Sequence, residues 1–153
     1  MPHEALLALL LTAAATESFA AKMQSLWATE LALGSIHYGD SKKSVLALLG
    51  KPSSESPANV KDPESKYPGL TITFSENAEV RYVVSSSDAY CTPSYVCPGM
   101  PFSRAQDSYG SIHILEASGD KVSAYFGSKL ACKLTFEVQQ GIIKSIGAGC
   151  PLS

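Results

Sequence analysis

The sequence has few charged residues and no block of like charge. Charged residues make up 17% of the 153 residues, and the 12 basic and 14 acidic residues are dispersed along the chain. Nucleic acids and anionic membranes both attract basic patches, so this pattern argues against either as a partner. Hydrophobic residues make up 45% of the chain, which is enough for the core of one domain.

Motifs for metal ions, cofactors and nucleophilic catalysis are also missing. The cysteines form no C-x2-C pair, which zinc sites and thioredoxin-like sites use, and neither H-E-x-x-H nor G-x-S-x-G occurs. The segment nearest to a phosphate loop, residues 147–149, is followed by neither Lys-Ser nor a helix. We therefore predict no metal site, no cofactor and no enzymatic activity.

The N-terminal residues have the pattern of a secretory leader. Residues 5–15 are almost wholly apolar, and Ser18-Phe19-Ala20 forms a small-x-small cleavage site before Ala21. No Lys or Arg precedes the apolar run, and the alternative is a buried N-terminal helix, because the run is too short to span a bilayer. We predict a signal peptide at residues 1–20 and a periplasmic single domain at residues 21–153, with no membrane span.

Two segments of the chain share the same spacing of glycines and apolar residues. Two glycines eleven residues apart precede three apolar positions spaced by six and four. The first set is Gly39, Gly50, Phe74, Val80 and Val84, and the second is Gly99, Gly110, Phe136, Ile142 and Ile146. Five matched positions in the same order predict tandem repeats at about residues 36–88 and 96–150.

Each predicted repeat combines one short helix with antiparallel strands. Asp40 or Ser41 can cap the first helix, and Leu48 is predicted to share its buried face. Residues 53–67 are predicted to be a loop, and residues 22–33 a helix, although a strand could begin at Leu31 instead. The predicted fold class is α+β: two tandem helix-plus-antiparallel-sheet repeats packed as one domain.

Four cysteines remain after the leader, and an even number in an exported chain predicts two disulfides with three possible pairings. A hairpin around residues 139–141 would bring Cys132 near Cys150, with an offset of one or two positions that a β-bulge could absorb. Cys91 then pairs with Cys97 by elimination, and that disulfide closes a tight loop.

A helix that ends in Gly-Lys-Pro at residues 50–52, followed by a strand that ends in Phe74 and a strand that begins with Val80, is similar to the repeat of the β-lactamase-inhibitor-protein-like group. That group is similar in turn to the small outer-membrane assembly lipoproteins, whose lipid-anchor cysteine this chain lacks near the cleavage site. The resemblance implies a helix-on-sheet unit, used twice, that binds another protein, as exported inhibitors and periplasmic immunity proteins do.

The predicted contact residues surround the second helix and the first cysteine pair. Tyrosine buries a large area at a small cost in entropy, which favours it at binding sites. The alternative for Tyr109 is a ring at the edge of the core with its hydroxyl in water. The predicted partner-binding residues are Ser108, Tyr109, Ser111, Tyr90 and Tyr95.

These observations favour a periplasmic inhibitor, most specifically an immunity protein that blocks a peptidoglycan-degrading hydrolase. The partner would be a secreted or periplasmic protein. A first alternative is an envelope assembly or scaffold module. A second is a small hydrolase that uses His37 or His113 with a serine, but Ser85-Ser86-Ser87-Asp88 is better explained as a polar connector.

Overall fold

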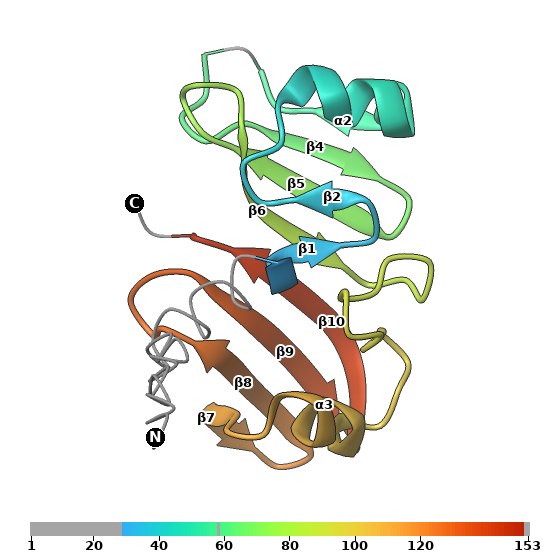
Figure 1. Ribbon diagram of the computed structural model, residues 1–153, viewed down its shortest axis with the longest axis vertical. Helices are drawn as coiled ribbons and strands as arrows, with labels where there is room; N and C mark the ends of the chain where they lie inside the picture. The colour runs from blue at the N-terminus through green and yellow to red at the C-terminus, as the bar shows by residue number, and fades with distance from the viewer. Residues whose placement is uncertain (1–28, 58, 152–153) are drawn as a thin grey trace, which may run out of the picture.

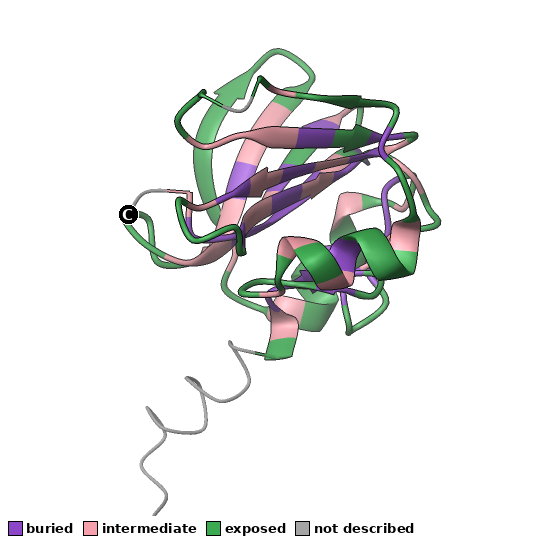
Figure 2. Cartoon of the chain, turned by 90° about the horizontal axis from the view of Figure 1, so that it is seen from above, coloured by how far each residue is buried: buried purple, intermediate pink, exposed green. Residues whose placement is uncertain are grey.

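The computed structural model describes residues 29–57 and 59–151, and shows one large antiparallel sheet with helices on one side (Figures 1 and 2). Its eight strands have the order β3-β4-β5-β6-β10-β9-β8-β7. The first four are β3 (Ser54–Glu55), β4 (Glu64–Tyr67), β5 (Leu70–Phe74) and β6 (Val80–Ser85). The others are β10 (Ile142–Gly149), β9 (Lys133–Gln139), β8 (Lys121–Gly127) and β7 (His113–Ser118). The helices are α2 (Lys42–Leu49) and α3 (Phe102–Tyr109). The α+β fold class is therefore confirmed.

The last strand of the chain lies in the middle of the sheet. β10 pairs antiparallel with β6, so that Gly147 lies opposite Val84, and also with β9. Along the chain, a helix followed by four strands occurs twice, and the strand order runs outward from the β6–β10 pair in both directions. The central pair therefore joins the N-terminal and C-terminal halves of the sheet.

The two helices begin differently. The Ser41 side chain caps α2 by accepting a hydrogen bond of 3.1 Å from the Ser44 amide, as predicted. Pro101 precedes α3 and makes no side-chain cap. Gly50 ends α2 with a φ of 76°, a conformation that glycine adopts without strain.

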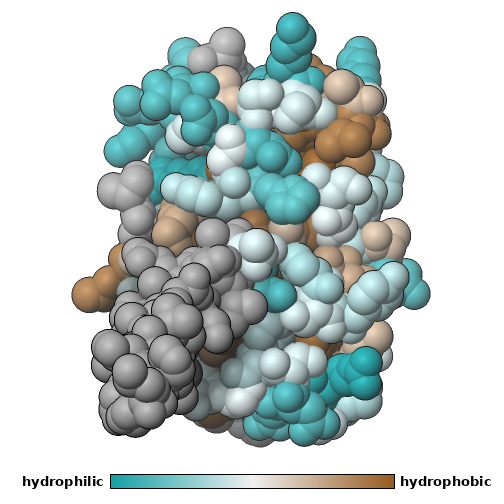
Figure 3. Space-filling view, in the orientation of Figure 1, coloured by the Kyte–Doolittle hydropathy of each residue, from teal (hydrophilic) through white to brown (hydrophobic). Residues whose placement is uncertain are grey.

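The predicted buried face of α2 is wrong in part. Val45 is buried, but 57% of Leu48 is exposed, and Leu46 on the same helix is also exposed. Figure 3 shows apolar side chains gathered at the outer side of α2. The helix has two turns, and its Val45 side faces the sheet, so Leu49 still packs against the core whereas Leu46 and Leu48 project past its edge.

Two segments differ from their predicted structures. The predicted loop at residues 53–67 contains β3 and β4, because Ser65 and Tyr67 alternate with exposed residues and face the core. In the described part of the predicted helix, residues 29–30 are helical, and two short strands follow, β1 (Ala32–Leu33) and β2 (Ile36–His37). Residues 22–28 and the predicted signal peptide lie outside the described residues.

Both predicted disulfides are confirmed, and so is the bulge. Gln139 lies opposite Ile142 at the turn, the register shifts by one residue between Ile143 and Ser145, and Lys133 lies opposite Gly149 at the far end. This shift places Cys132 and Cys150 opposite each other, with their Cα atoms 4.0 Å apart. The Cys91–Cys97 disulfide completes the pairing.

The core lies between the sheet and the layer formed by α2, α3 and the β1–β2 hairpin. Alternate side chains of the central strands point into it and are fully buried. The largest of these on the central strands are Phe74, Phe136, Ile72, Leu134, Ile143 and Ile146. We call the opposite side of the sheet the outer face. None of the helices among the described residues is long and apolar enough to cross a membrane.

Candidate partner-binding site

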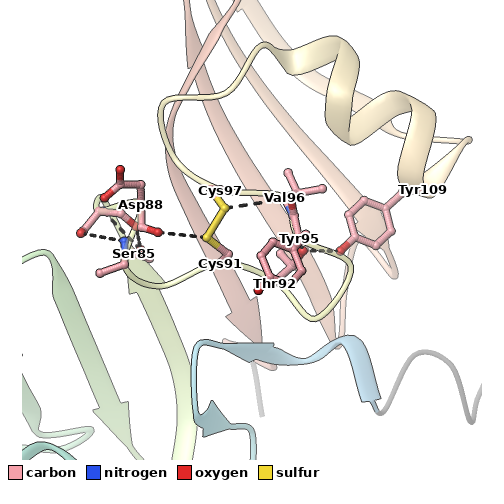
Figure 4. Close-up of a disulfide and its surroundings, with 10 residues drawn as sticks. Ser85, Asp88, Cys91, Thr92, Tyr95, Val96, Cys97 and Tyr109 are labelled. Carbon is pink, nitrogen blue, oxygen red and sulfur yellow. Dashed lines mark hydrogen bonds between the residues drawn. A yellow bond between two sulfur atoms is a disulfide. The ribbon is translucent and has the colours of Figure 1, made fainter.

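The Cys91–Cys97 disulfide holds a five-residue loop in one conformation (Figure 4). Inside it, the Thr92 amide donates to the Val96 carbonyl at 2.9 Å, and the Val96 amide donates to the Thr92 hydroxyl at 3.1 Å. Thr92 and Val96 are buried, whereas Tyr95 is 73% exposed. The loop therefore has two anchored ends and presents one aromatic ring to solvent.

Tyr95 adopts an uncommon backbone conformation. Its φ is 65°, a region that non-glycine residues rarely occupy. The Tyr95 amide donates to the Thr92 carbonyl at 2.9 Å, which closes a turn inside the disulfide ring. The disulfide and this turn together fix the backbone that carries the exposed ring, so the loop is ordered before any partner arrives.

Tyr109 connects the loop to α3 and to the N-terminal segment. Its hydroxyl oxygen lies 2.7 Å from the Glu30 carboxylate and 2.7 Å from the Thr92 hydroxyl. A phenol has one proton to donate, and the carboxylate can only accept, so Tyr109 donates to Glu30 and Thr92 donates to Tyr109. Figure 4 shows the Tyr109 ring reaching from α3 toward Thr92.

The environment of Tyr109 favours the neutral phenol. Burial raises the pKa of its hydroxyl far above the ordinary value; the hydrogen bond to Thr92 opposes this shift, and the Glu30 carboxylate adds to it. The ring also packs against Phe126 and Phe136, with centroid distances of 5.1 Å and 6.1 Å. Tyr109 thus lies at the edge of the core, but its hydroxyl is bonded within the chain instead of being in water.

The five predicted contact residues divide into two groups. Tyr109 and Tyr90 are half-buried, and the Tyr90 ring packs so closely on Gly34 that a Cβ atom there would lie 3.0 Å from it. The other three, Tyr95, Ser108 and Ser111, are exposed. The structure therefore bonds Tyr109 to the loop through Thr92, and leaves Tyr95 as the large exposed ring of the set.

Glu30 is the member of this cluster that the sequence did not indicate. It accepts from the Ser94 hydroxyl at 2.7 Å as well as from Tyr109, and so connects the N-terminal segment to the loop. The sequence separation from Tyr109 is 79 residues, and no local pattern signals such a contact. The role of Thr92 could have been predicted, because a threonine hydroxyl can accept a hydrogen bond from a backbone amide a few residues further along the chain, which here is the amide of Val96.

A shallow groove lies beside the loop, at the junction of the two halves of the sheet. It combines hydroxyl, carboxylate, ammonium and apolar groups. Its lining residues include Ser86, Ser87, Asp88, Pro98, Ile142 and Lys144. Among the described residues, no buried side-chain oxygen or nitrogen lacks a hydrogen-bond partner, so the groove has no buried unsatisfied polar atom that points to a ligand.

The two histidines of the hydrolase hypothesis lie in unrelated places. The Nδ1 atom of exposed His37 is 3.7 Å from an oxygen of Asp40. His113 stacks on Tyr125, with ring centroids 5.2 Å apart. Within the part of the chain that the structure describes, neither imidazole is hydrogen-bonded to a serine, and no group of three metal-ligating side chains occurs.

Comparisons with known proteins identify the fold but not a family. No family model and no curated protein match the chain. An extracellular protein containing a SCP domain from Bacillus anthracis matches over 74% of this chain, with 11% identity and a TM-score of 0.49, and the chain spans 44% of the length of that protein. A DUF4309 family protein (YjgB) from Bacillus subtilis matches over 72% of this chain and 78% of its own, with 11% identity and a TM-score of 0.51. The second likeness concerns the fold alone.

Proposed function

We propose that this chain is an exported protein-binding inhibitor, most specifically an immunity protein that occludes a peptidoglycan-degrading hydrolase. One observation carries the proposal: Tyr95 is 73% exposed at the tip of a loop whose conformation is fixed before binding. An exposed aromatic ring on a rigid loop has the properties of an interface anchor, because its burial costs little conformational entropy.

The choice of an inhibitor over a scaffold depends on the shape that such a loop fits. A hydrolase that acts on a polymer has a concave active site, and ordered loops with aromatic tips suit concave surfaces. The exposed hydroxyls of Ser108 and Ser111 at the end of α3 would supply polar contacts beside the ring. Two disulfides support an oxidising compartment, which is where such hydrolases work.

The internal architecture supports a binding module formed by duplication. The element order of one helix and four strands occurs twice, and a matched pair of glycines brackets the helix in each half, Gly39 and Gly50 in the first and Gly99 and Gly110 in the second. The matched residues Val84 and Ile146 differ, since Val84 lies on the outer face of the sheet and Ile146 is buried in the core. Phe74 is the last residue of β5, the third strand of the first half, and Phe136 lies within β9, the third strand of the second half. Both are fully buried. We include in the proposal that the halves are tandem repeats, of which the second has acquired the binding loop at its start.

The test is capture of the partner followed by an assay of its activity. Purified protein with both disulfides intact is incubated with periplasmic and secreted fractions, and bound proteins are identified by mass spectrometry. The proposal expects one stoichiometric cell-wall hydrolase, whose activity falls when this protein is added. Recovery of envelope assembly proteins without inhibition would instead establish the scaffold function and overturn the inhibitor.

A matched pair of variants tests the loop itself. Tyr95→Ala should weaken binding at least tenfold, because loss of an anchor tyrosine costs about 2 kcal/mol. Tyr38→Ala is the control, since Tyr38 is also an exposed tyrosine, at 45%, but lies outside the loop. Equal affinity of the two variants would show that the loop is not the contact surface, whatever partner is found.

A further inference from the structure

The strand β7 is a long exposed edge of the sheet. All six of its residues are exposed, and among the described strands it pairs with β8 alone. Two of its apolar side chains, Ile114 and Leu115, are 53% and 58% exposed. A free strand edge presents a row of amide and carbonyl groups that another strand can bond, and soluble proteins usually protect such edges.

The opposite edge of the sheet is protected. β3 has only two residues, and Pro52 and Pro57 lie close to its two ends. Proline cannot donate a ladder hydrogen bond, so a second chain cannot extend far along this edge. The sheet therefore has one protected edge and one edge that is open to pairing.

We infer that β7 pairs antiparallel with β7 of a second copy of this chain. The sequence His113-Ile114-Leu115-Glu116 is complementary to itself when it is read in opposite directions. With the two-fold axis between Ile114 and Leu115, His113 lies opposite Glu116 of the partner subunit. Ile114 then lies opposite Leu115 of the partner subunit, and the symmetry creates each of these pairs twice.

The face on which each side chain lies agrees with this register. His113 is opposite Tyr125 and Glu116 is opposite Ser123 in β8, so both lie on the outer face of the sheet. Ile114 is opposite Ala124, which faces the core. Residues opposite each other on paired strands share a face, so the acid and the imidazole would meet on one face and Ile114 would lie on the other.

Two further features favour this pairing. The β7–β8 register shifts between Ile114 and Glu116, so Leu115 is the extra residue of a bulge, and this extra residue is what places His113 and Glu116 on the same face of the sheet. The His113 ring is stacked on Tyr125, so little side-chain freedom remains to be lost on pairing. The contact is small compared with a standard interface, and we expect a weak dimer that forms as the concentration rises.

Sedimentation velocity from about 1 µM to about 1 mM tests the inference on the purified, oxidised protein. The wild type should pass from monomer to dimer in this range, and Leu115→Lys should raise the dissociation constant at least tenfold. Leu48→Lys is the matched control, since Leu48 is 57% exposed but lies on α2. A monomer throughout the range, or a dimer that survives Leu115→Lys, would overturn the inference.

A charge exchange tests the register. His113→Glu places two acids opposite each other and should weaken the dimer at least tenfold, whereas His113→Glu combined with Glu116→Arg should restore it to within about threefold of the wild type. Circular dichroism confirms that each variant is folded. If the double variant dimerises no more tightly than His113→Glu alone, the proposed register is wrong. None of these measurements uses the hydrolase, so they succeed or fail independently of the proposed function.

Discussion

The Tyr109 hydroxyl lies 2.7 Å from the carboxylate of Glu30, although 79 residues separate the two along the chain. This bond joins α3 to the segment that leads into β1, and the neighbouring bond from Ser94 to Glu30 joins the same segment to the disulfide loop. A single carboxylate thus fixes the positions of two elements around the proposed contact surface.

Replacing Tyr109 by phenylalanine should destabilise the protein modestly. The change removes the bonds to Glu30 and Thr92 but keeps the packing against Phe126 and Phe136, and the expected loss is about 1–2 kcal/mol in the free energy of unfolding. Urea denaturation measures it. Glu30→Gln in the Tyr109→Phe background should cost less than in the wild type, and strictly additive losses would contradict the coupling.

Stability should decline at alkaline pH. Burial raises the pKa values of Tyr109 and Tyr82, so the native state keeps these phenol protons at a pH where the unfolded chain has lost them. Their contribution is therefore complete below the unfolded value of about 10 and is lost as the pH rises above it. Urea midpoints measured on both sides of that pH should show the decline, and it should be smaller in Tyr109→Phe. An identical decline in that variant would exclude Tyr109 as a cause.

Gly147 leaves space for the Tyr82 side chain. On the outer face, the Tyr82 hydroxyl contacts the Thr135 hydroxyl across β10, and a Cβ atom at Gly147 would overlap both oxygen atoms. Gly147→Ala should cost about 1–3 kcal/mol, because both side chains must move. In a background that combines Tyr82→Ala with Thr135→Ala, the same substitution should cost well under 1 kcal/mol. A similar cost in both backgrounds would mean that the backbone, and not the two side chains, demands glycine.

The two disulfides should contribute unequally. Cys132 and Cys150 are 18 residues apart and Cys91 and Cys97 only six, so loop closure predicts losses of about 3 and about 2 kcal/mol when each pair is changed to serine. Denaturation of the two double variants measures the difference. The Cys91–Cys97 variant should in addition lose affinity for the partner, because Tyr95 is no longer held in place. Unchanged affinity of the Cys91–Cys97 variant would show that the disulfide-held loop is not needed for binding.

The hairpin and its disulfide could be predicted because the information is local. The apolar alternation of β9 and β10 and the glycine at their turn set a register, and the count of residues to the two cysteines required one bulge, which occurs between Ile143 and Ser145. Side chains alternate between the two faces of a strand, so a pairing offset of one residue can be recognised from the sequence alone. The cap at Ser41 is local in the same sense.

Other features depend on contacts that no local pattern encodes. Leu48 has the spacing of a core residue, but whether a two-turn helix buries that position depends on where the sheet ends. β4 has few apolar residues and is a strand because β5 provides hydrogen bonds beside it. Glu30 was predicted only as part of a helix, and its partners lie in two distant elements.

The central position of β10 governs when this protein can fold. Until residues 142–149 are available, β6 has no partner on one side and the N-terminal half of the sheet ends in an open edge. The Cys132–Cys150 disulfide and the bond from the Arg81 side chain to the Pro151 carbonyl form only with that strand in place. The complete sheet can therefore form only after the C-terminal end of the chain is available, and the Cys132–Cys150 disulfide can close only at that stage.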